Sequence, residues 1–145
     1  MIISITAAPM ADFVLDAFVA TAWCLKDEAT SYTDGILRAL SGMAEAIAPR
    51  LRAYEVRNRV LMGTRRQRMT KADAADFIAS LTDFRIRLCD PPSYDALFVL
   101  SDRYALTVYD AAYLDPAMRE SLPLASLDKR LVRGAEVAGV VLFQL

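Results

Sequence analysis

The chain contains no histidine, and this absence removes several kinds of active site at once. The serine and cysteine nucleophiles of hydrolases are commonly activated by an imidazole, and zinc sites commonly use imidazole ligands. Any catalysis must therefore depend on carboxylates, on hydroxyls, on lysine or arginine, or on a metal ion held by oxygen ligands. The sequence directs attention to its acidic residues.

Cysteines and long hydrophobic runs are also scarce. The two cysteines, Cys24 and Cys89, lie far apart and belong to no metal-type pair, which favours reduced and partly buried thiols. Charged residues interrupt every apolar run before it reaches the ~18 residues that a membrane span needs. These patterns predict a cytoplasmic protein that does not enter a membrane.

The first residues of the chain form a separate feature. Residues 1–11 are apolar but have no basic start, and acidic residues follow at once, which argues against a signal peptide. A true translation start at Met10, in place of Met1, would explain the segment equally well. We expect 1–11 to be a dispensable extension and 12–145 to form a single domain.

Short apolar runs alternate with longer helical patterns along the 145 residues. The strand-like runs lie at 12–16, 45–49, 85–89, 122–128 and 140–143. The helical patterns lie at 19–25, 30–42, 49–68, 70–83, 93–105 and 129–139. Pro49 suits the first turn of its helix, and Thr30 and Thr70 stand where helices begin. This alternation predicts an α/β fold, a three-layer α/β/α sandwich around a mostly parallel sheet of about five strands.

Aspartates stand where apolar runs end. Asp16 closes the run "FVLD", Asp128 closes "LASLD", and Asp110 follows "LTVY". Each could simply cap the helix that follows it. Ligands of parallel α/β sheets, however, bind beyond the carboxyl ends of the strands, so these aspartates are also candidates for a common site.

A glutamate strengthens the second interpretation. On the helix predicted from Pro49, helical spacing places Glu55 and Asn58 on one stripe with Leu51 and Met62, and we expect that stripe to face the sheet. A buried carboxylate needs a compensating partner, which leaves two alternatives: an arginine or a raised pKa, or a site shared with the aspartates. Several carboxylates in one place require a cation, and hard oxygen ligands select Mg²⁺ or Mn²⁺.

Positive charge is concentrated in one segment. Between residues 50 and 68 lie seven arginines and a single acid, Glu55, whereas the whole chain has a formal net charge of −1. Such a segment suits a polyanionic substrate beside a metal site, although a solvated surface is an equally good interpretation. The candidates for RNA contact are Arg57, Arg59, Arg65, Arg66 and Arg68.

Four fragments in this order resemble the PIN-domain ribonucleases, especially the VapC-type toxins of bacterial toxin–antitoxin pairs. They are "FVLDAFVATAWCLKDE", "APRLRAYEVRNRVL", "LTVYDAAYLDPAMRESLPLASLDKRL" and "GVVLF", and together they span nearly the whole chain. The resemblance implies a PIN-like sandwich with a central parallel sheet and an endoribonuclease site that needs Mg²⁺ or Mn²⁺. It also implies a homodimer inhibited by a cognate VapB-like antitoxin.

The resemblance assigns roles to individual residues. Asp16 matches the family's first aspartate, Glu55 its helical glutamate, and Asp110 the aspartate of "YDAxYL". Asp128 matches the aspartate of the family's "TxD" stretch. These four are the catalytic and metal-binding candidates, and we expect Asp16 and Asp110 to be direct ligands.

The same resemblance supplies two supporting residues. Asn58 matches an amide that commonly follows the glutamate by three positions, and Ser126 keeps the hydroxyl of the family's threonine. We expect both to lie beside the carboxylates.

Three positions depart from the family's pattern. Phe18 stands where a serine or threonine is usual, and Arg52 replaces an aromatic residue. Pro116 falls inside a helix that the family keeps continuous, and with Asp115 as an N-cap it predicts two shorter helices. These departures bear on how strongly the site binds metal.

The leading functional hypothesis is hydrolysis of an RNA phosphodiester by metal-activated water, as the toxin of a toxin–antitoxin pair. Attack by water would leave a 3′-hydroxyl and a 5′-phosphate. The alternative is a catalytically impaired PIN-like module that binds RNA or protein. A haloacid-dehalogenase-type phosphatase and a receiver domain fit poorly, because Phe18 stands where the former needs an acid and the latter needs an acidic pair near the first strand.

Overall fold

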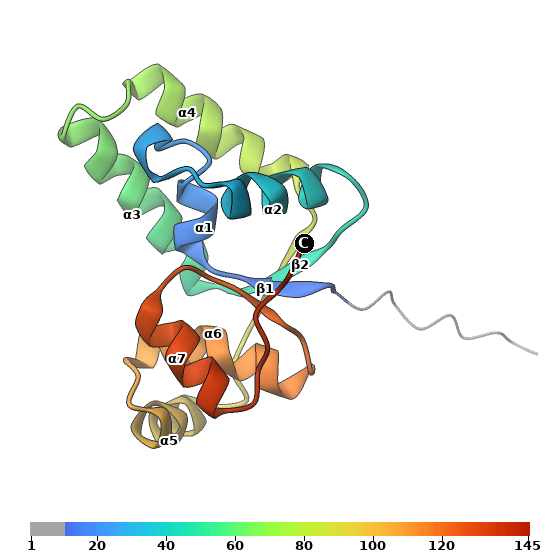
Figure 1. Cartoon of the computed structure of the whole chain (residues 1–145). Helices are drawn as coiled ribbons and strands as arrows, with labels where there is room; N and C mark the ends of the chain where they lie inside the picture. The colour runs from blue at the N-terminus through green and yellow to red at the C-terminus, as the bar shows by residue number, and fades with distance from the viewer. Residues whose placement is uncertain (1–10) are drawn as a thin grey trace, which may run out of the picture.

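The computed structural model describes residues 11–145, which fold as alternating strands and helices (Figure 1). The predicted extension at 1–11 lies outside the described residues, apart from Ala11, which is buried in the core. The four strands are β1 (Phe13–Leu15), β2 (Ala46–Pro49), β3 (Ile86–Cys89) and β4 (Leu124–Ala125). The helices are α1 (Ala17–Thr21), α2 (Ser31–Ser41), α3 (Leu51–Arg65), α4 (Lys71–Ser80), α5 (Tyr94–Tyr104), α6 (Val108–Arg119) and α7 (Lys129–Val137), with short 3₁₀ turns η1 (Lys26–Glu28) and η2 (Leu81–Asp83).

The sheet is parallel throughout, in the order β3-β2-β1-β4. Helices α1 to α4 lie on one side of it and α5 to α7 on the other, so the predicted α/β/α sandwich is confirmed (Figure 1). Because all strands point the same way, their carboxyl ends meet along one edge. The residues that follow β1 and β4 are therefore neighbours in space.

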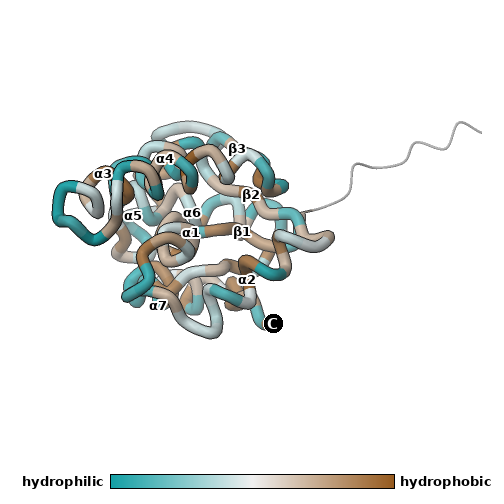
Figure 2. The backbone as a smooth tube through the Cα atoms, turned by 90° about the horizontal axis from the view of Figure 1, so that it is seen from above, coloured by the Kyte–Doolittle hydropathy of each residue, from teal (hydrophilic) through white to brown (hydrophobic). Residues whose placement is uncertain are grey.

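The core lies on both faces of β1. Phe13, Val14 and Leu15 have no exposed surface, as expected for a strand covered by helices on both sides. Val14 packs with the α6 layer, whereas Phe13 and Leu15 pack with Ile36 of α2. Hydrophobic colour follows β1 through the middle of the molecule in Figure 2. This rigid centre fixes the positions of the residues at the sheet edge.

Several helices begin at the hydroxyl caps that the sequence predicts. The side chain of Thr30 accepts a hydrogen bond from the backbone N–H of Thr33 at 3.1 Å and starts α2. Thr70 accepts from the N–H of Asp73 at 3.0 Å and starts α4. Both predicted helix starts are confirmed, because a side-chain acceptor satisfies an N–H group that the helix leaves free.

The fifth strand is reduced to a single bridge. Leu142 pairs with Leu124, and the N–H of Phe143 donates to the carbonyl of Leu124 at 2.8 Å, but no ladder extends beyond this point. β4 itself has only two residues, so it offers little length for a neighbour to pair with. The prediction of about five strands is therefore corrected to four strands and one bridge within residues 11–145.

Two prolines, Pro49 and Pro116, do not have the helix positions that the sequence predicts for them. Pro49 is the last residue of β2, paired with Cys89, and α3 begins only at Leu51. Proline is tolerated there because it ends a strand and need not donate to a continuing ladder. The expected helix start at Pro49 is wrong.

Pro116 lies inside α6, which continues without a break from Val108 to Arg119. The carboxylate of Asp115 accepts a hydrogen bond from Arg119 at 2.9 Å and caps nothing. Proline removes one backbone bond to the fourth residue before it, and burial of the helix from Ala111 to Ala117 supports the remainder. The predicted split into two helices is wrong, and Asp110 lies in the first turn of a full-length helix.

None of the helices in residues 11–145 has the length and apolar character needed to cross a membrane.

Candidate active site

Asp16 and Ser126 meet at the carboxyl edge of the sheet. Leu15 and Ala125 are paired across β1 and β4, so the next residue on each strand lies at the same level. The Ser126 hydroxyl donates to Asp16 Oδ2 at 2.8 Å, and both side chains are buried. Asp16 Oδ1 also accepts weakly, at 3.5 Å, from the N–H of Phe18. The prediction that Ser126 lies beside a carboxylate is confirmed.

Asp128 is linked to the same serine. Its N–H donates to Ser126 Oγ at 3.0 Å, and its carboxylate caps α7 by accepting from the N–H groups of Arg130 and Leu131 at 2.9 and 3.1 Å. One carboxylate oxygen makes both cap bonds, so the other is left for a further ligand. Capping and a role in a common site are compatible for Asp128.

Asp110 is not a helix cap. Thr107 performs that role, since its hydroxyl accepts from the N–H of Asp110 at 3.0 Å, and Asp110 is the third residue of α6. The cap interpretation of Asp110 is therefore wrong, because a hydroxyl three residues earlier already satisfies the free N–H. The Asp110 carboxylate forms none of the ion pairs found within residues 11–145, and a hydrogen bond with the Thr107 side chain lowers its pKa.

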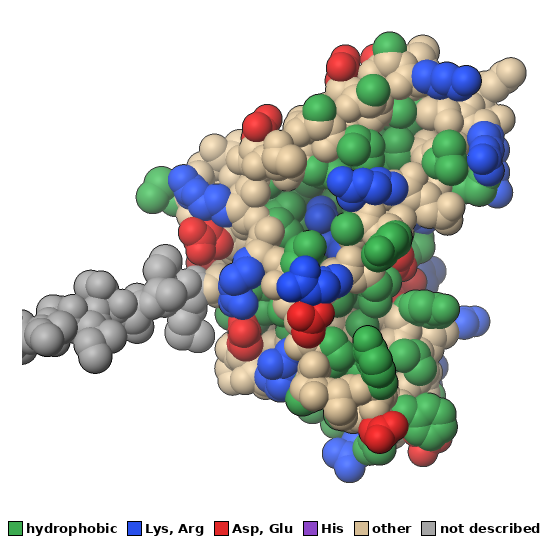
Figure 3. Space-filling view, turned by 180° about the vertical axis from the view of Figure 1, so that it is seen from behind, with side chains coloured by type: hydrophobic (Ala, Val, Ile, Leu, Met, Phe, Trp, Pro, Cys, Tyr) green, Lys and Arg blue, Asp and Glu red, His purple; other side chains and the backbone are tan. Residues whose placement is uncertain are grey.

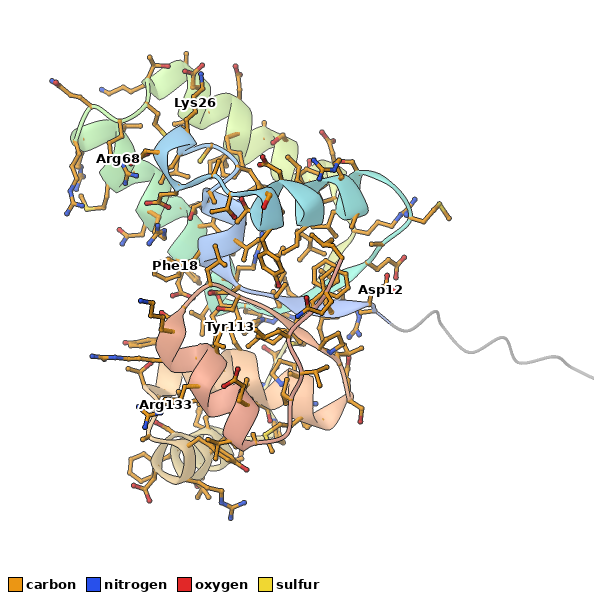
Figure 4. The ribbon with its side chains drawn as sticks, in the orientation of Figure 1. Asp12, Phe18, Lys26, Arg68, Tyr113 and Arg133 are labelled. Carbon is orange, nitrogen blue, oxygen red and sulfur yellow. The ribbon has the colours of Figure 1, made fainter. Side chains whose placement is uncertain are left out.

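Glu55 joins the site through a tyrosine that sequence reasoning missed. The hydroxyl of Tyr113 donates to Glu55 Oε1 at 2.6 Å, and Tyr113 is only 1 % exposed. Tyr113 follows Asp110 by three residues on α6, so the two share a helix face. That spacing within "YDAAYL" was the signal that could have identified it. In Figure 4 Tyr113 lies under the sheet, between the two helix layers.

Electrostatics link the four carboxylates. Burial raises the pKa of Asp16 to about 6, against the lowering effect of Ser126, and the charges of Glu55 and Asp128 raise it further. Burial also raises the pKa of Glu55 and of Asp110; the first feels the charge of Asp110 and the second that of Asp128. Each carboxylate thus repels at least one other, although they come from four different elements.

These residues fit a hard divalent cation in their chemistry. Their donors are carboxylate oxygens, their mutual repulsion would be relieved by a positive ion, and none of them forms an ion pair in the part of the chain that the structure describes. No three acidic or cysteine side chains within 11–145 come close enough to form a complete ligand set, however. Water would therefore have to complete the coordination, as it commonly does around Mg²⁺.

The predicted inward stripe of α3 is shifted. The buried residues of this helix are Arg52, Val56, Val60 and Gly63, and Asn58 is exposed. Glu55 lies at the border of the buried face, where it is half-buried. The expectation that Asn58 faces the sheet is wrong, because the helix packs on α1 and α4 with the stripe that follows Arg52, and its supporting role stays a prediction.

The five arginines proposed for RNA contact divide into two groups. Arg59 donates to Glu28 at 2.8 Å and to Thr21 at 2.9 Å, and its guanidinium lies 3.8 Å from the centre of the Phe18 ring. Arg68 pairs with both Asp27 and Glu28. The others are exposed: Arg57, which donates to a backbone carbonyl of its own helix, and Arg65 and Arg66 at its end.

Phe18 occupies the place next to Asp16. Its ring is 40 % exposed and covered on one side by the Arg59 guanidinium, a cation–π contact. Figure 4 shows Phe18 near the end of β1 and Arg68 farther out along the α3 layer. An aromatic ring and an arginine thus lie beside Asp16.

Comparison with known proteins identifies the fold and nothing more specific. No family model and no curated protein matches the chain. The crystal structure of PAE2754 from Pyrobaculum aerophilum is similar, with a TM-score of 0.69 and 19% sequence identity over 86% of this chain and 84% of that one. At this identity the similarity establishes a shared fold.

Proposed function

We propose that this protein is a Mg²⁺- or Mn²⁺-dependent endoribonuclease that acts as the toxin of a toxin–antitoxin pair. One observation carries the proposal: four carboxylates from different elements repel one another at the carboxyl edge of a parallel sheet, and none of them is neutralised by an ion pair within 11–145. Ligand sites of α/β sheets lie at this edge. Repulsion that no ion pair relieves is expected where a cation binds.

The side chains divide the work as follows. Asp16 and Asp110 would hold the divalent ion directly, and Asp128 and Glu55 through water. Ser126 and Tyr113 fix the orientation of Asp16 and Glu55 by the hydrogen bonds of 2.8 and 2.6 Å. A bound ion would supply positive charge, which would activate water and stabilise the charge developing on the phosphate. Glu55, with its raised pKa, is suited to accept a proton from the attacking water.

RNA cleavage with purified protein tests this proposal. We expect a single-stranded RNA to be cut with Mn²⁺, not with EDTA, and to leave a 3′-hydroxyl and a 5′-phosphate. Asp16→Asn should abolish cleavage, whereas Asp90→Asn, which alters an exposed carboxylate paired with Arg50, should not. Products that end in a 2′,3′-cyclic phosphate would contradict attack by water.

Growth arrest tests the toxin role. Expression of the wild-type chain in the bacterial cytoplasm without a partner should stop cell growth, and Asp110→Asn should relieve the arrest. An equally toxic Asp110→Asn chain would contradict the carboxylate mechanism. A short neighbouring gene for a VapB-like antitoxin is the corresponding genetic expectation.

A homodimer is part of the same proposal. Tyr94 and Phe98 of α5 and Tyr109 of α6 are large side chains with more than two thirds of their surface exposed. Exposed aromatic residues on neighbouring helices favour a protein interface. Light scattering should give twice the chain mass, and Phe98→Asp should lower it to the monomer value.

The second candidate is a catalytically impaired module that binds RNA or protein. It is favoured by the lack of a preformed three-ligand set within 11–145 and by Phe18, covered by Arg59, beside Asp16. Calorimetric titration with Mn²⁺ separates the two candidates. Binding that Asp16→Ala removes supports the nuclease, and no binding to the wild type supports the module.

A further inference from the structure

Phe18 is a large apolar side chain that the packing of the protein does not cover. The other four residues of α1 are buried, whereas Phe18 is exposed. A single exposed ring is common on protein surfaces and needs no explanation by itself. The position of this ring is unusual, because the N–H of Phe18 donates to Asp16 Oδ1, a carboxylate of the candidate site, at 3.5 Å (Figure 4).

One face of the ring is held by a fixed cation. The Arg59 guanidinium lies over that face, 3.8 Å from the ring centre. Arg59 donates to Glu28 at 2.8 Å and to the hydroxyl of Thr21 at 2.9 Å. That hydroxyl donates in turn to the carbonyl oxygen of Phe18 at 3.3 Å. These contacts hold the cation in place, so the exposed surface of the ring lies away from Arg59.

The contact with Arg59 does not account for the ring. A cation–π contact at an exposed site contributes little to stability, and Arg59 has two hydrogen-bond partners without it. A smaller side chain at this position would leave both of those hydrogen bonds in place. The open side of Phe18 is therefore available for a ligand.

The surroundings of the ring favour a nucleobase over a protein as that ligand. Protein interfaces use contiguous apolar surface, whereas the contacts of Phe18 are with the charged or polar side chains of Asp16 and Arg59. A nucleobase needs only one flat aromatic face, because every base has a π face of its own. Its phosphates can then lie among charged groups.

We propose that Phe18 is a specificity-determining residue whose open side stacks on the base of a nucleotide next to the phosphodiester at the carboxylate site. The bases of a duplex are already stacked on one another, so this ring favours unpaired nucleotides. Arg59, paired with Glu28, supports the ring from behind. The inference rests on the proposed function, because it assumes that an RNA strand crosses the carboxylate site. It does not depend on how a metal ion is held.

Fluorescence anisotropy with a labelled single-stranded RNA tests the inference, in EDTA so that the strand stays intact. Phe18→Leu removes the ring but keeps an apolar side chain, and it should weaken binding ~10-fold. Phe18→Tyr keeps the ring and should bind like the wild type. The matched control Tyr54→Leu removes an exposed ring of α3 on the side opposite its buried residues, and it should also bind like the wild type.

An abasic strand identifies the part of the RNA that the ring contacts. This strand keeps the sugar–phosphate backbone and lacks the bases. The wild type should bind it more weakly than the complete strand, and Phe18→Leu should bind it as the wild type does. A structural role of Phe18 would weaken binding of both strands equally, and that result would overturn the inference.

The remaining outcomes separate the inference from the function on which it rests. Equal affinity of the wild type and Phe18→Leu for the complete strand would overturn the inference, as would no binding by the wild type. Cleavage with Mn²⁺ decides the nuclease proposal separately. Ring-dependent binding without any cleavage would support the inference and contradict the nuclease.

A second variant covers the case in which Phe18→Leu does not fold, which circular dichroism would reveal. Phe18→Trp places an indole at the same position, and its fluorescence is measured against that of Trp23 in the wild type. The complete strand should quench the added fluorescence and the abasic strand should not. Added fluorescence that the complete strand leaves unchanged would overturn the inference.

Discussion

Two charged regions of this molecule differ in how far their charges are paired. Near the carboxyl edge of the sheet, four carboxylates lie on different elements and none forms an ion pair within 11–145. Around α3, by contrast, three of the seven arginines form ion pairs: Arg50 with Asp90, Arg59 with Glu28, and Arg68 with Asp27 and Glu28. The comparison shows that carboxylates that are at least partly buried and form no ion pair within 11–145, and not a high density of charge, mark the candidate site.

The paired arginines have a structural task. Glu28 accepts hydrogen bonds from both Arg59 and Arg68, which ties η1 to α3 and to the turn after it. Ion pairing therefore reduces the excess positive charge that the segment 50–68 presents at the surface. In Figure 3 the Lys and Arg side chains of one face lie in separate places among red and green ones, with no continuous basic patch.

Two matched substitutions, one in each charged region, should give the largest difference in cleavage activity. Glu55→Gln keeps an acceptor for Tyr113 but removes an unpaired charge, so we expect Mn²⁺-dependent cleavage to fall by about 10²–10³-fold. Glu28→Gln removes a paired charge, and the free energy of unfolding should fall by ~1 kcal/mol with cleavage nearly unchanged. Cleavage rates and urea denaturation measure both; equal losses of activity would contradict the distinction.

The pH dependence of stability should show the second largest effect. The pKa of Asp16 is raised from 3.8 to about 6, so the folded protein holds this proton more tightly than the unfolded chain does. Its stabilising contribution is complete below about pH 4 and is lost as the pH rises through about 6, a change of up to ~3 kcal/mol. The chain has no histidine to obscure this range.

Urea denaturation in EDTA at about pH 5 and about pH 7.5 measures that change. We expect the metal-free wild type to be more stable at the lower pH. Asp16→Asn should reduce the difference and be more stable than the wild type at the higher pH. Mn²⁺ should stabilise the wild type there and not Asp16→Asn. A wild type that loses stability on acidification over this range would contradict the assignment.

The smallest expected effect is on RNA binding by the arginines at and after the end of α3. Replacing the exposed Arg65 and Arg66 by alanine should weaken binding of single-stranded RNA a few-fold and lower the salt slope by about 0.7 per charge. Arg68→Ala should alter RNA binding less, because Asp27 and Glu28 already neutralise it. Fluorescence anisotropy at several KCl concentrations distinguishes the two, and a greater loss for Arg68→Ala would reverse the interpretation.

Local signals predicted most of the fold. The apolar runs of β1, β2 and β3 and the hydroxyl caps at Thr30 and Thr70 are found where the sequence placed them. The predictions that failed depended on neighbours. Pro116 stays helical because the surrounding layers bury it, and the last strand is reduced because β4 offers only two residues.

The site was predicted in part. Asp16, Ser126 and Asp128 come together because paired parallel strands end side by side, which a sequence pattern can reveal. The true buried stripe of α3 could not be read in the same way, since Arg52 is a polar residue on its buried face and Glu55 lies at the border. Periodicity assumes that buried positions are apolar, and at this helix the buried Arg52 is not.

The sequence by itself determined the kinds of chemistry open to this protein and the alternation of strands and helices. It has no histidine and it places carboxylates after apolar runs. Both features can be read without knowing which residues are neighbours in space. Only the tertiary structure decided which charges remain free. The hydrogen bond from Tyr113 to Glu55 joins residues 58 positions apart in the sequence. Electrostatic free energies depend on the distances between charged groups in space and on their solvent exposure, which the fold sets.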